Sequence, residues 1–127
     1  MASTEPRRGE VWLVSLGAGR SGEPGKNCPA IVVSADQLTA DLPNELIVIV
    51  PLSSSVPPSG LRPEVITGEG VKRPSRAVCG AVRGVARARL LRRLGALPPA
   101  KLIEVDRALA LVLDLQLASP PARRRRT

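Results

Sequence analysis

Aromatic residues are almost missing from this 127-residue chain, which has one Trp and neither Tyr nor Phe. Proteins that read single-stranded RNA through an RNA-recognition motif or an oligonucleotide-binding fold stack the bases on aromatic side chains. The scarcity of aromatics therefore argues against readers of this kind. A nucleic acid bound here would be held by arginine planes, apolar side chains and backbone groups.

Histidine is absent, and the only two cysteines are Cys28 and Cys79. The chain therefore cannot build a metal site that uses His, and two thiols are too few for a structural zinc site or a disulfide framework. No apolar run reaches the roughly 18 residues of a membrane span. The segment Met1–Gly9 is polar and lacks the apolar region of a signal peptide. We expect a soluble, cytoplasmic protein with free thiols and no membrane partner.

Positive charge is in excess and is unevenly distributed. The chain has 19 Lys and Arg against 11 Asp and Glu, a net charge of +8. No acid occurs between Gly70 and Ile103, a stretch that contains Lys72, Arg73, Arg76, Arg83, Arg87, Arg89, Arg92 and Arg93. A basic surface of this kind either keeps the protein soluble or faces a polyanion such as RNA, DNA, an anionic membrane or an acidic protein. We favour the polyanion.

The first half of the chain has the patterns of β-strands. Half-buried alternation at 10–16 and apolar, β-branched runs at 30–33 and 46–50 predict three strands. Weaker strand candidates follow at 64–67 and 77–82. The long Gly-rich stretch at 17–27 predicts a loop, and loops of this length are often functional.

The second half is predicted to become helical, with a short turn at 86–91 and a helix from Pro99 to Leu115. In the helix, apolar residues recur at helical spacing at Leu102, Val105, Leu109, Val112 and Leu113. Pro98 and Pro99 stand where a helix start tolerates proline. We expect this helix to cover a sheet or to form a dimer face. The fold class is mainly β with one C-terminal helix.

The length of the chain suits one domain, which we place at 9–117. A polar tail at 1–8 precedes it. A Pro/Arg-rich tail at 118–127 follows and carries four consecutive arginines. Such a charge block is expected to be disordered. It is either a solvated tail or a source of nonspecific affinity for phosphates.

Four short motifs, in order, carry a family resemblance. They are RGEVW at 8–12, GE at 22–23 leading to PAIVVS at 29–34, VPLSS at 50–54, and AVR at 81–83 with RARL at 87–90. The final helix adds EVDRAL at 104–109. Together they resemble the MazF/PemK (Kid-like) toxins of type II toxin–antitoxin systems, in particular their actinobacterial branch. The resemblance covers about residues 7–116.

The resemblance implies an SH3-like β-barrel with a C-terminal helix, paired into a homodimer. Members of this family are sequence-specific endoribonucleases, or mRNA interferases, that cut single-stranded RNA without metal or any other cofactor. Their substrates are mostly messenger RNA and sometimes ribosomal or transfer RNA. A cognate acidic antitoxin binds the dimer and blocks the RNA groove with its disordered C-terminal segment.

Metal-free RNA cleavage uses the 2′-hydroxyl of the substrate as the nucleophile and leaves a 2′,3′-cyclic phosphate. The enzyme supplies acid–base help and preorganised charge. In the family, an Arg before the Pro of the second strand and a Thr or Ser closing the third strand carry most of this work. The hydroxyl position is Ser53, which would donate a hydrogen bond to the scissile phosphate. The alternative is that Ser53 only satisfies a turn at the strand end.

Position 28 departs from the family because Cys28 stands where Arg is expected. A cysteine has no fixed positive charge and cannot grip a phosphate with two hydrogen bonds. Three explanations remain open: the protein is an inactivated toxin, Lys26 or Arg20 in the same loop supplies the charge, or the Cys28 thiol has a new role. The only activating neighbour that we identify for the thiol is Lys26.

Glu23 matches a loop acid of the family, and it orients the loop, accepts a hydrogen bond from a base or acts as a base. The alternative is a solvated loop acid. The candidate RNA-binding residues are Arg20, Lys26, Arg62, Arg73 and Arg83. We expect Cys79 to be a buried structural thiol. Gly80 stands where some relatives have an Asp, so their acid-assisted mechanism is not carried over. Trp12 is expected in the core, and the alternative is that it stacks a base.

Three functions from different classes follow. The first is an active endoribonuclease toxin. The second is a catalytically impaired family member, with Arg replaced by Cys28, that still binds RNA or its antitoxin. The third sets the resemblance aside and makes the chain a basic β-barrel that binds nucleic acid or the ribosome. Cleavage of RNA in EDTA separates the first from the other two.

Overall fold

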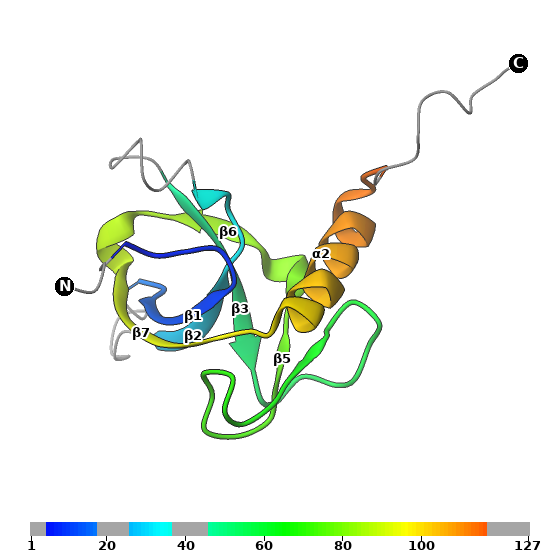
Figure 1. The fold of residues 1–127 in the computed structure, drawn as a ribbon, viewed down its shortest axis with the longest axis horizontal. Helices are drawn as coiled ribbons and strands as arrows, with labels where there is room; N and C mark the ends of the chain where they lie inside the picture. The colour runs from blue at the N-terminus through cyan, green and yellow to red at the C-terminus, as the bar shows by residue number, and fades with distance from the viewer. Residues whose placement is uncertain (1–4, 18–25, 37–45, 117–127) are drawn as a thin grey trace, which may run out of the picture.

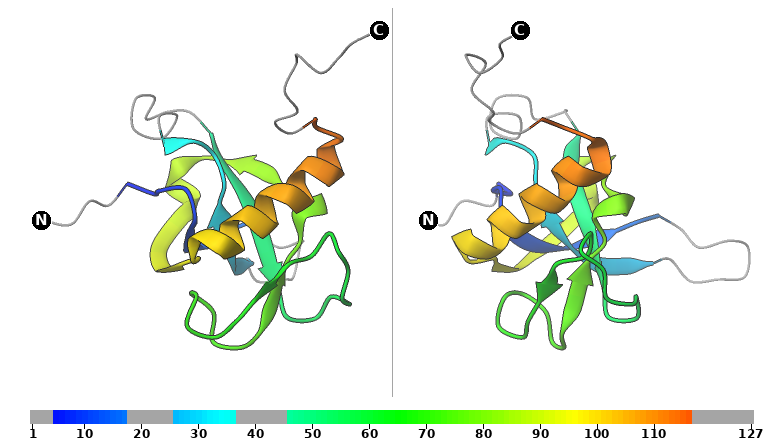
Figure 2. Two further views of the ribbon diagram at one scale, coloured as in Figure 1. Left: turned by 45° about the vertical axis from the view of Figure 1, so that its right-hand side comes forward. Right: turned by 90° about the vertical axis from the view of Figure 1, so that its right-hand side faces the viewer.

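The computed structural model describes residues 5–17, 26–36 and 46–116. Ten elements follow one another: β1 (Glu10–Ser15), β2 (Asn27–Val32), β3 (Ile47–Ser53), β4 (Glu64–Val65), β5 (Ser75–Ala77), the 3-10 turn η1 (Cys79–Ala81), β6 (Arg83–Val85), the 3-10 turn η2 (Arg87–Arg89), β7 (Leu90–Ala96) and α2 (Pro99–Leu113). The strands curl into a half-barrel, and α2 lies along one side of it (Figures 1 and 2). The expected fold class, mainly β with one C-terminal helix, is confirmed.

The strands form one sheet in the order β4-β5-β3-β2-β1-β7, with β6 added beside β3. All pairings between the named strands are antiparallel. Strand β2 lies in the middle, where Ala30 is paired with Trp12 of β1 on one side and with Pro51 of β3 on the other. The first half of β3 pairs with β6 and its end pairs with β5, so β3 joins the two parts of the curved sheet.

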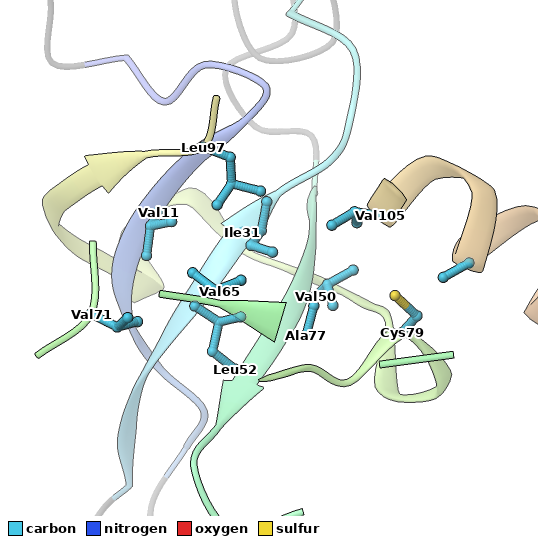
Figure 3. Packing of buried hydrophobic residues seen from close by; sticks show 11 residues of the cluster. Val11, Ile31, Val50, Leu52, Val65, Val71, Ala77, Cys79, Leu97 and Val105 are labelled. Carbon is cyan, nitrogen blue, oxygen red and sulfur yellow. The ribbon is translucent and has the colours of Figure 1, made fainter. Parts of the chain in front are cut away.

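Alternation along the central strands produces a hydrophobic core on each face of the sheet. Val11 and Ile31 belong to the cluster that α2 covers, which Figure 3 shows. Trp12, Ala30 and Val32 belong to the cluster on the opposite face. Trp12 is 6% exposed, so the expectation that it is a core residue is confirmed.

Helix α2 is held to the barrel by packing and by one arginine. Val105 and Ala108 are buried in the first core, next to the fully buried Cys79 of η1. The Arg8 guanidinium forms an ion pair with Asp106 of α2 and donates a hydrogen bond to the carbonyl of Val33 at 2.7 Å. The helix therefore covers the sheet, as expected. In the described part of the chain, no helix is both long and apolar enough to cross a membrane.

The strands expected at 30–33 and 46–50 are longer in the structure than predicted. Strand β2 begins at Asn27, because the pairing with β1 runs from Val11↔Ile31 to Ser15↔Asn27. Strand β3 continues through Pro51 to Ser53, where β5 pairs with it. These extensions place Cys28 within β2 and carry β3 to Ser53, the residue expected to close the third strand.

The region after residue 75 corrects the sequence interpretation. The strand expected at 77–82 is wrong beyond its first residue, because β5 ends at Ala77 and η1 follows. The turn expected at 86–91 is present as η2, but β6 and β7 on either side of it were missed. Strand β7 lacks clean alternation because its pairing with β1 shifts register twice, which leaves Leu94 and Leu91 as extra residues opposite β1.

The loop between β4 and β5 presses onto the barrel at two glycines. Gly70 has a φ of +114°, and a Cβ placed there would lie 2.7 Å from the Cβ of Val11. A Cβ on Gly95 of β7 would lie 2.8 Å from the Cα of Gly70. A side chain at either position would keep the loop from approaching the barrel this closely, so both positions require glycine. The contact fixes the loop that carries Lys72 and Arg73.

We expect Gly95→Ala to lower the free energy of unfolding by about 1–3 kcal/mol, the usual cost of forcing a methyl group into a packed site. Urea denaturation measures it. Gly80→Ala is the matched control, because nothing lies within 4 Å of a Cβ at that position. Equal unfolding midpoints for the two variants would contradict the close approach of the loop.

Candidate functional site

A pocket of about 490 Å³ lies at the rim of the barrel where β3 ends. We call it the Ser53 pocket. Its polar lining consists of the cations Lys26, Lys72, Arg73 and Arg92 and the serines Ser53, Ser54, Ser55 and Ser75. No carboxylate of the described residues lines it. The pocket therefore combines hydroxyl donors with uncompensated positive charge, which suits a phosphate group.

The strand register explains how these groups come together. Leu13 of β1 pairs with Pro29 of β2 on one side and with Arg92 of β7 on the other. All three residues line the pocket, so they form one row across three strands. Lys72 and Arg73 reach the same pocket from the loop seated on Gly95. Groups far apart in the sequence thus meet at one rim.

Ser53 is half-exposed and already takes part in a turn. Its Oγ accepts a hydrogen bond from the backbone N–H of Ser55 at 3.2 Å and lies 3.2 Å from the Ser55 Oγ. A serine hydroxyl can accept such bonds and still donate its own hydrogen. The turn role and the phosphate-binding role expected for Ser53 are therefore compatible.

Cys28 lies on β2, close to the Ser53 pocket but not in its lining. The last pair of β2 with β3 at this end is Ala30↔Pro51, and Cys28 and Ser53 each lie two residues beyond it along their strands. Desolvation by burial raises the pKa of the Cys28 thiol above the ordinary 9.0, although the charges of Lys26 and Arg83 lower it in part. The thiol is therefore neutral at pH 7 and contributes neither a positive charge nor a thiolate.

The structure brings some of the expected RNA-binding residues together and separates one. Lys26 and Arg73 line the Ser53 pocket, and Arg83 is close enough to Cys28 to lower its pKa. Arg62 lines a different pocket beside α2, and its guanidinium donates to the carbonyl of Pro57 at 3.1 Å. Arg20 and Glu23 lie outside the described residues.

Sequence reasoning missed Lys72 and Arg92 as site residues. Both lie in the acid-free basic stretch, so composition pointed to the region but not to these side chains. Selecting Arg92 required knowledge of β7, the strand that the sequence pattern concealed.

The second thiol has no part in this rim. Cys79 is fully buried, and desolvation raises its pKa to about 11. Both cysteines are free, as expected. The interpretation of Cys79 as a buried structural thiol is confirmed.

Comparison with known proteins decides the family. A model of the PemK-like, MazF-like toxins of type II toxin–antitoxin systems matches residues 7–113. The chain belongs to this family. It is similar to the endoribonuclease MazF9 of Mycobacterium tuberculosis, with 35% identity over 116 residues that cover 86% of this chain and 97% of the relative.

Solved structures of the family share the fold of this MazF-like chain. A mycobacterial endoribonuclease in complex with its cognate antitoxin superposes with a TM-score of 0.71 at 21% identity, covering 91% of this chain and 99% of that one. The MazE–MazF complex of Deinococcus radiodurans superposes with a TM-score of 0.77 at 20% identity, covering 90% and 100%. These matches confirm the expected family fold.

The raised pKa of Cys28 predicts slow alkylation near neutral pH. We expect the rate with iodoacetamide to rise with pH and to reach half of its maximum above pH 9.0. Mass spectrometry of the Cys28 peptide follows the reaction separately from Cys79. Arg83→Gln removes a charge that lowers this pKa, so the midpoint should move further up. Equal midpoints for the two proteins would contradict the placement of Arg83 beside Cys28.

Proposed function

We propose that this toxin is a metal-independent, sequence-specific endoribonuclease that cuts single-stranded RNA by attack of the 2′-hydroxyl on the adjacent phosphate. The observation that carries the proposal is the Ser53 pocket, in which a strand-end hydroxyl lies among four cations and no carboxylate of the described residues lines the wall. The relative with 35% identity is named an endoribonuclease. The products would carry a 2′,3′-cyclic phosphate and a 5′-hydroxyl.

Unpaired charge supports RNA as the ligand of this pocket. The side chains of Lys26, Lys72, Arg73 and Arg92 form no hydrogen bond or ion pair with any other described residue. Each can neutralise one phosphate and release counterions, which is the main source of affinity for nucleic acid backbones. A hydrogen bond from the Ser53 hydroxyl to the scissile phosphate would stabilise the charge that builds up in the transition state.

Activity depends on which residue supplies the positive charge at the scissile phosphate. With Cys28 at the family Arg position, either the toxin is impaired or a different cation acts in its place. The raised pKa of Cys28 speaks against a catalytic thiolate. An impaired member that still binds RNA or antitoxin is therefore the second candidate function.

The proposed partners are a second copy of the chain and an acidic antitoxin. Ile103, Leu111 and Leu113 of α2 are at least half-exposed, which leaves apolar surface for a homodimer contact. The positive Ser53 pocket suits an acidic antitoxin segment as well as RNA, so the antitoxin would compete with substrate. Related toxins are seen with their antitoxins in solved structures. The proposal places the protein in the cytoplasm, where RNA is available.

We expect purified protein to cut a long single-stranded RNA in EDTA and to leave cyclic phosphate ends. Ser53→Ala should lower kcat/KM by about 10²-fold, the usual effect of removing one preorganised donor. Ser59→Ala is the matched control, because the Ser59 Oγ accepts from the N–H of Leu61 in the same type of turn but lines the other pocket. Equal activity of both variants would remove Ser53 from the mechanism.

Restoring the guanidinium tests the impaired alternative. We expect Cys28→Arg to raise the cleavage rate at least tenfold if this copy is impaired, because a fixed charge then meets the phosphate with two hydrogen bonds. Cys28→Ser is the uncharged control of similar size. Unchanged cleavage by Cys28→Arg, measured on the same RNA, would show that another cation already fills this role.

A further inference from the structure

Arg92 of β7 and Ser53 of β3 both line the Ser53 pocket, although their strands are not neighbours in the sheet. Arg92 lies on β7 beside Leu13, Leu13 lies beside Pro29, and β2 is followed by β3, which ends at Ser53. A phosphate in this pocket would therefore have both a hydroxyl and a guanidinium in the lining around it. The role inferred for Arg92 rests on the proposed function, because Arg92 belongs to the same site.

The two neighbouring arginines of β7 have different environments. The Nε of Arg93 forms an ion pair with the Glu10 carboxylate at 2.9 Å. The side chain of Arg92 lines the Ser53 pocket and has no hydrogen-bond or ion-pair partner among the described residues. Among the described residues nothing engages the donors of Arg92, whereas the Nε–H of Arg93 is engaged by Glu10.

Arg92 is better placed for a precise contact than the other cations of the pocket. Lys26 and Lys72 offer only point charges, whereas a guanidinium matches two phosphate oxygens at once. Arg73 has that shape but lies on a loop. The backbone around Arg92 belongs to β7, where Arg87 donates to the carbonyl of Leu90 at 3.2 Å and Arg93 is tied to Glu10. Sites on strands hold their geometry more closely than sites on loops.

We propose that Arg92 binds the scissile phosphate together with Ser53, and so supplies the guanidinium that position 28 lacks. Two N–H groups of Arg92 donate to the non-bridging oxygens of one phosphodiester, and the Ser53 hydroxyl donates to the same group. Lys26, Lys72 and Arg73 then hold neighbouring phosphates of the strand.

The test compares Arg92→Gln and Arg92→Lys with the control Arg107→Gln. Arg107 is an exposed arginine of α2 that lines the other pocket, so its loss removes the same charge elsewhere. Cleavage of a long single-stranded RNA is measured in EDTA. We expect Arg92→Gln to lose about 10²–10³-fold in kcat/KM, the scale of one lost transition-state donor. Arg92→Lys keeps the charge but should lose at least tenfold, mainly in kcat.

Binding gives an independent readout on a probe that cannot be cut. The probe is a fluorescent 12-nucleotide RNA with 2′-O-methyl groups, titrated at several salt concentrations. Each phosphate contact on a single strand contributes about 0.7 to the slope of log affinity against log salt. Arg92→Gln should lose about that much, whereas Arg92→Lys and Arg107→Gln should each keep more of the slope than Arg92→Gln.

The outcomes separate this proposal from the proposed function. If the unmodified protein does not cut RNA, the endoribonuclease proposal fails, and the salt slope alone decides the role of Arg92. If Arg92→Gln cuts RNA and binds the probe as Arg107→Gln does, with the same slope, the assignment of Arg92 is overturned. Urea midpoints check that the variants are folded, and Arg92→Lys serves as the test if Arg92→Gln does not fold.

Discussion

The pairing of β2 with both β1 and β3 is the constraint on which the rest of the structure depends. Ala30, Ile31 and Val32 are fully buried, Ile31 in the core that α2 covers and the other two in the core on the opposite face, so a shift of β2 by one residue would exchange the side chains of the two cores. The same register places Ala30 of β2 beside Pro51, two residues before β3 ends at Ser53. The hydrophobic effect thus sets the geometry of the polar rim, although no apolar residue would act on a substrate.

The apolar segments of the fold were readable from sequence because their patterns are strong. The run at 46–50 and the spacing of the residues in α2 point to a strand and a helix directly. Strand β7 was not readable, because the two extra residues opposite β1 break the alternation that identifies a strand. Strand β2 was cut short because Asn27 and Pro29 have low strand propensity, and tertiary pairing with β1 overrides that preference.

The site residues divide in the same way, into those that a distinctive sequence pattern identified and those that it did not. Ser53 and Cys28 were found through motifs, since they adjoin apolar strands whose sequences are distinctive. Arg73 and Lys26 were found by charge, and both line the pocket; Arg62 was selected on the same ground and lies in another pocket. Charge alone cannot distinguish these positions, because which way an arginine points depends on strand register and on partners such as Glu10. The eight basic residues between Lys72 and Arg93 therefore predict a surface but not a site.

The irregular pairing of β7 with β1 has a consequence for how the rim tolerates change. Val11 pairs with Gly95 and Leu13 pairs with Arg92, whereas an unbroken ladder starting from Gly95 would place Arg93 opposite Leu13. The irregularity decides which of the two residues enters the pocket. Because both are arginines, a ladder without the irregularity at Leu94 would still place an arginine opposite Leu13. The doubled arginine thus makes the charge of the rim robust to a change of register in β7.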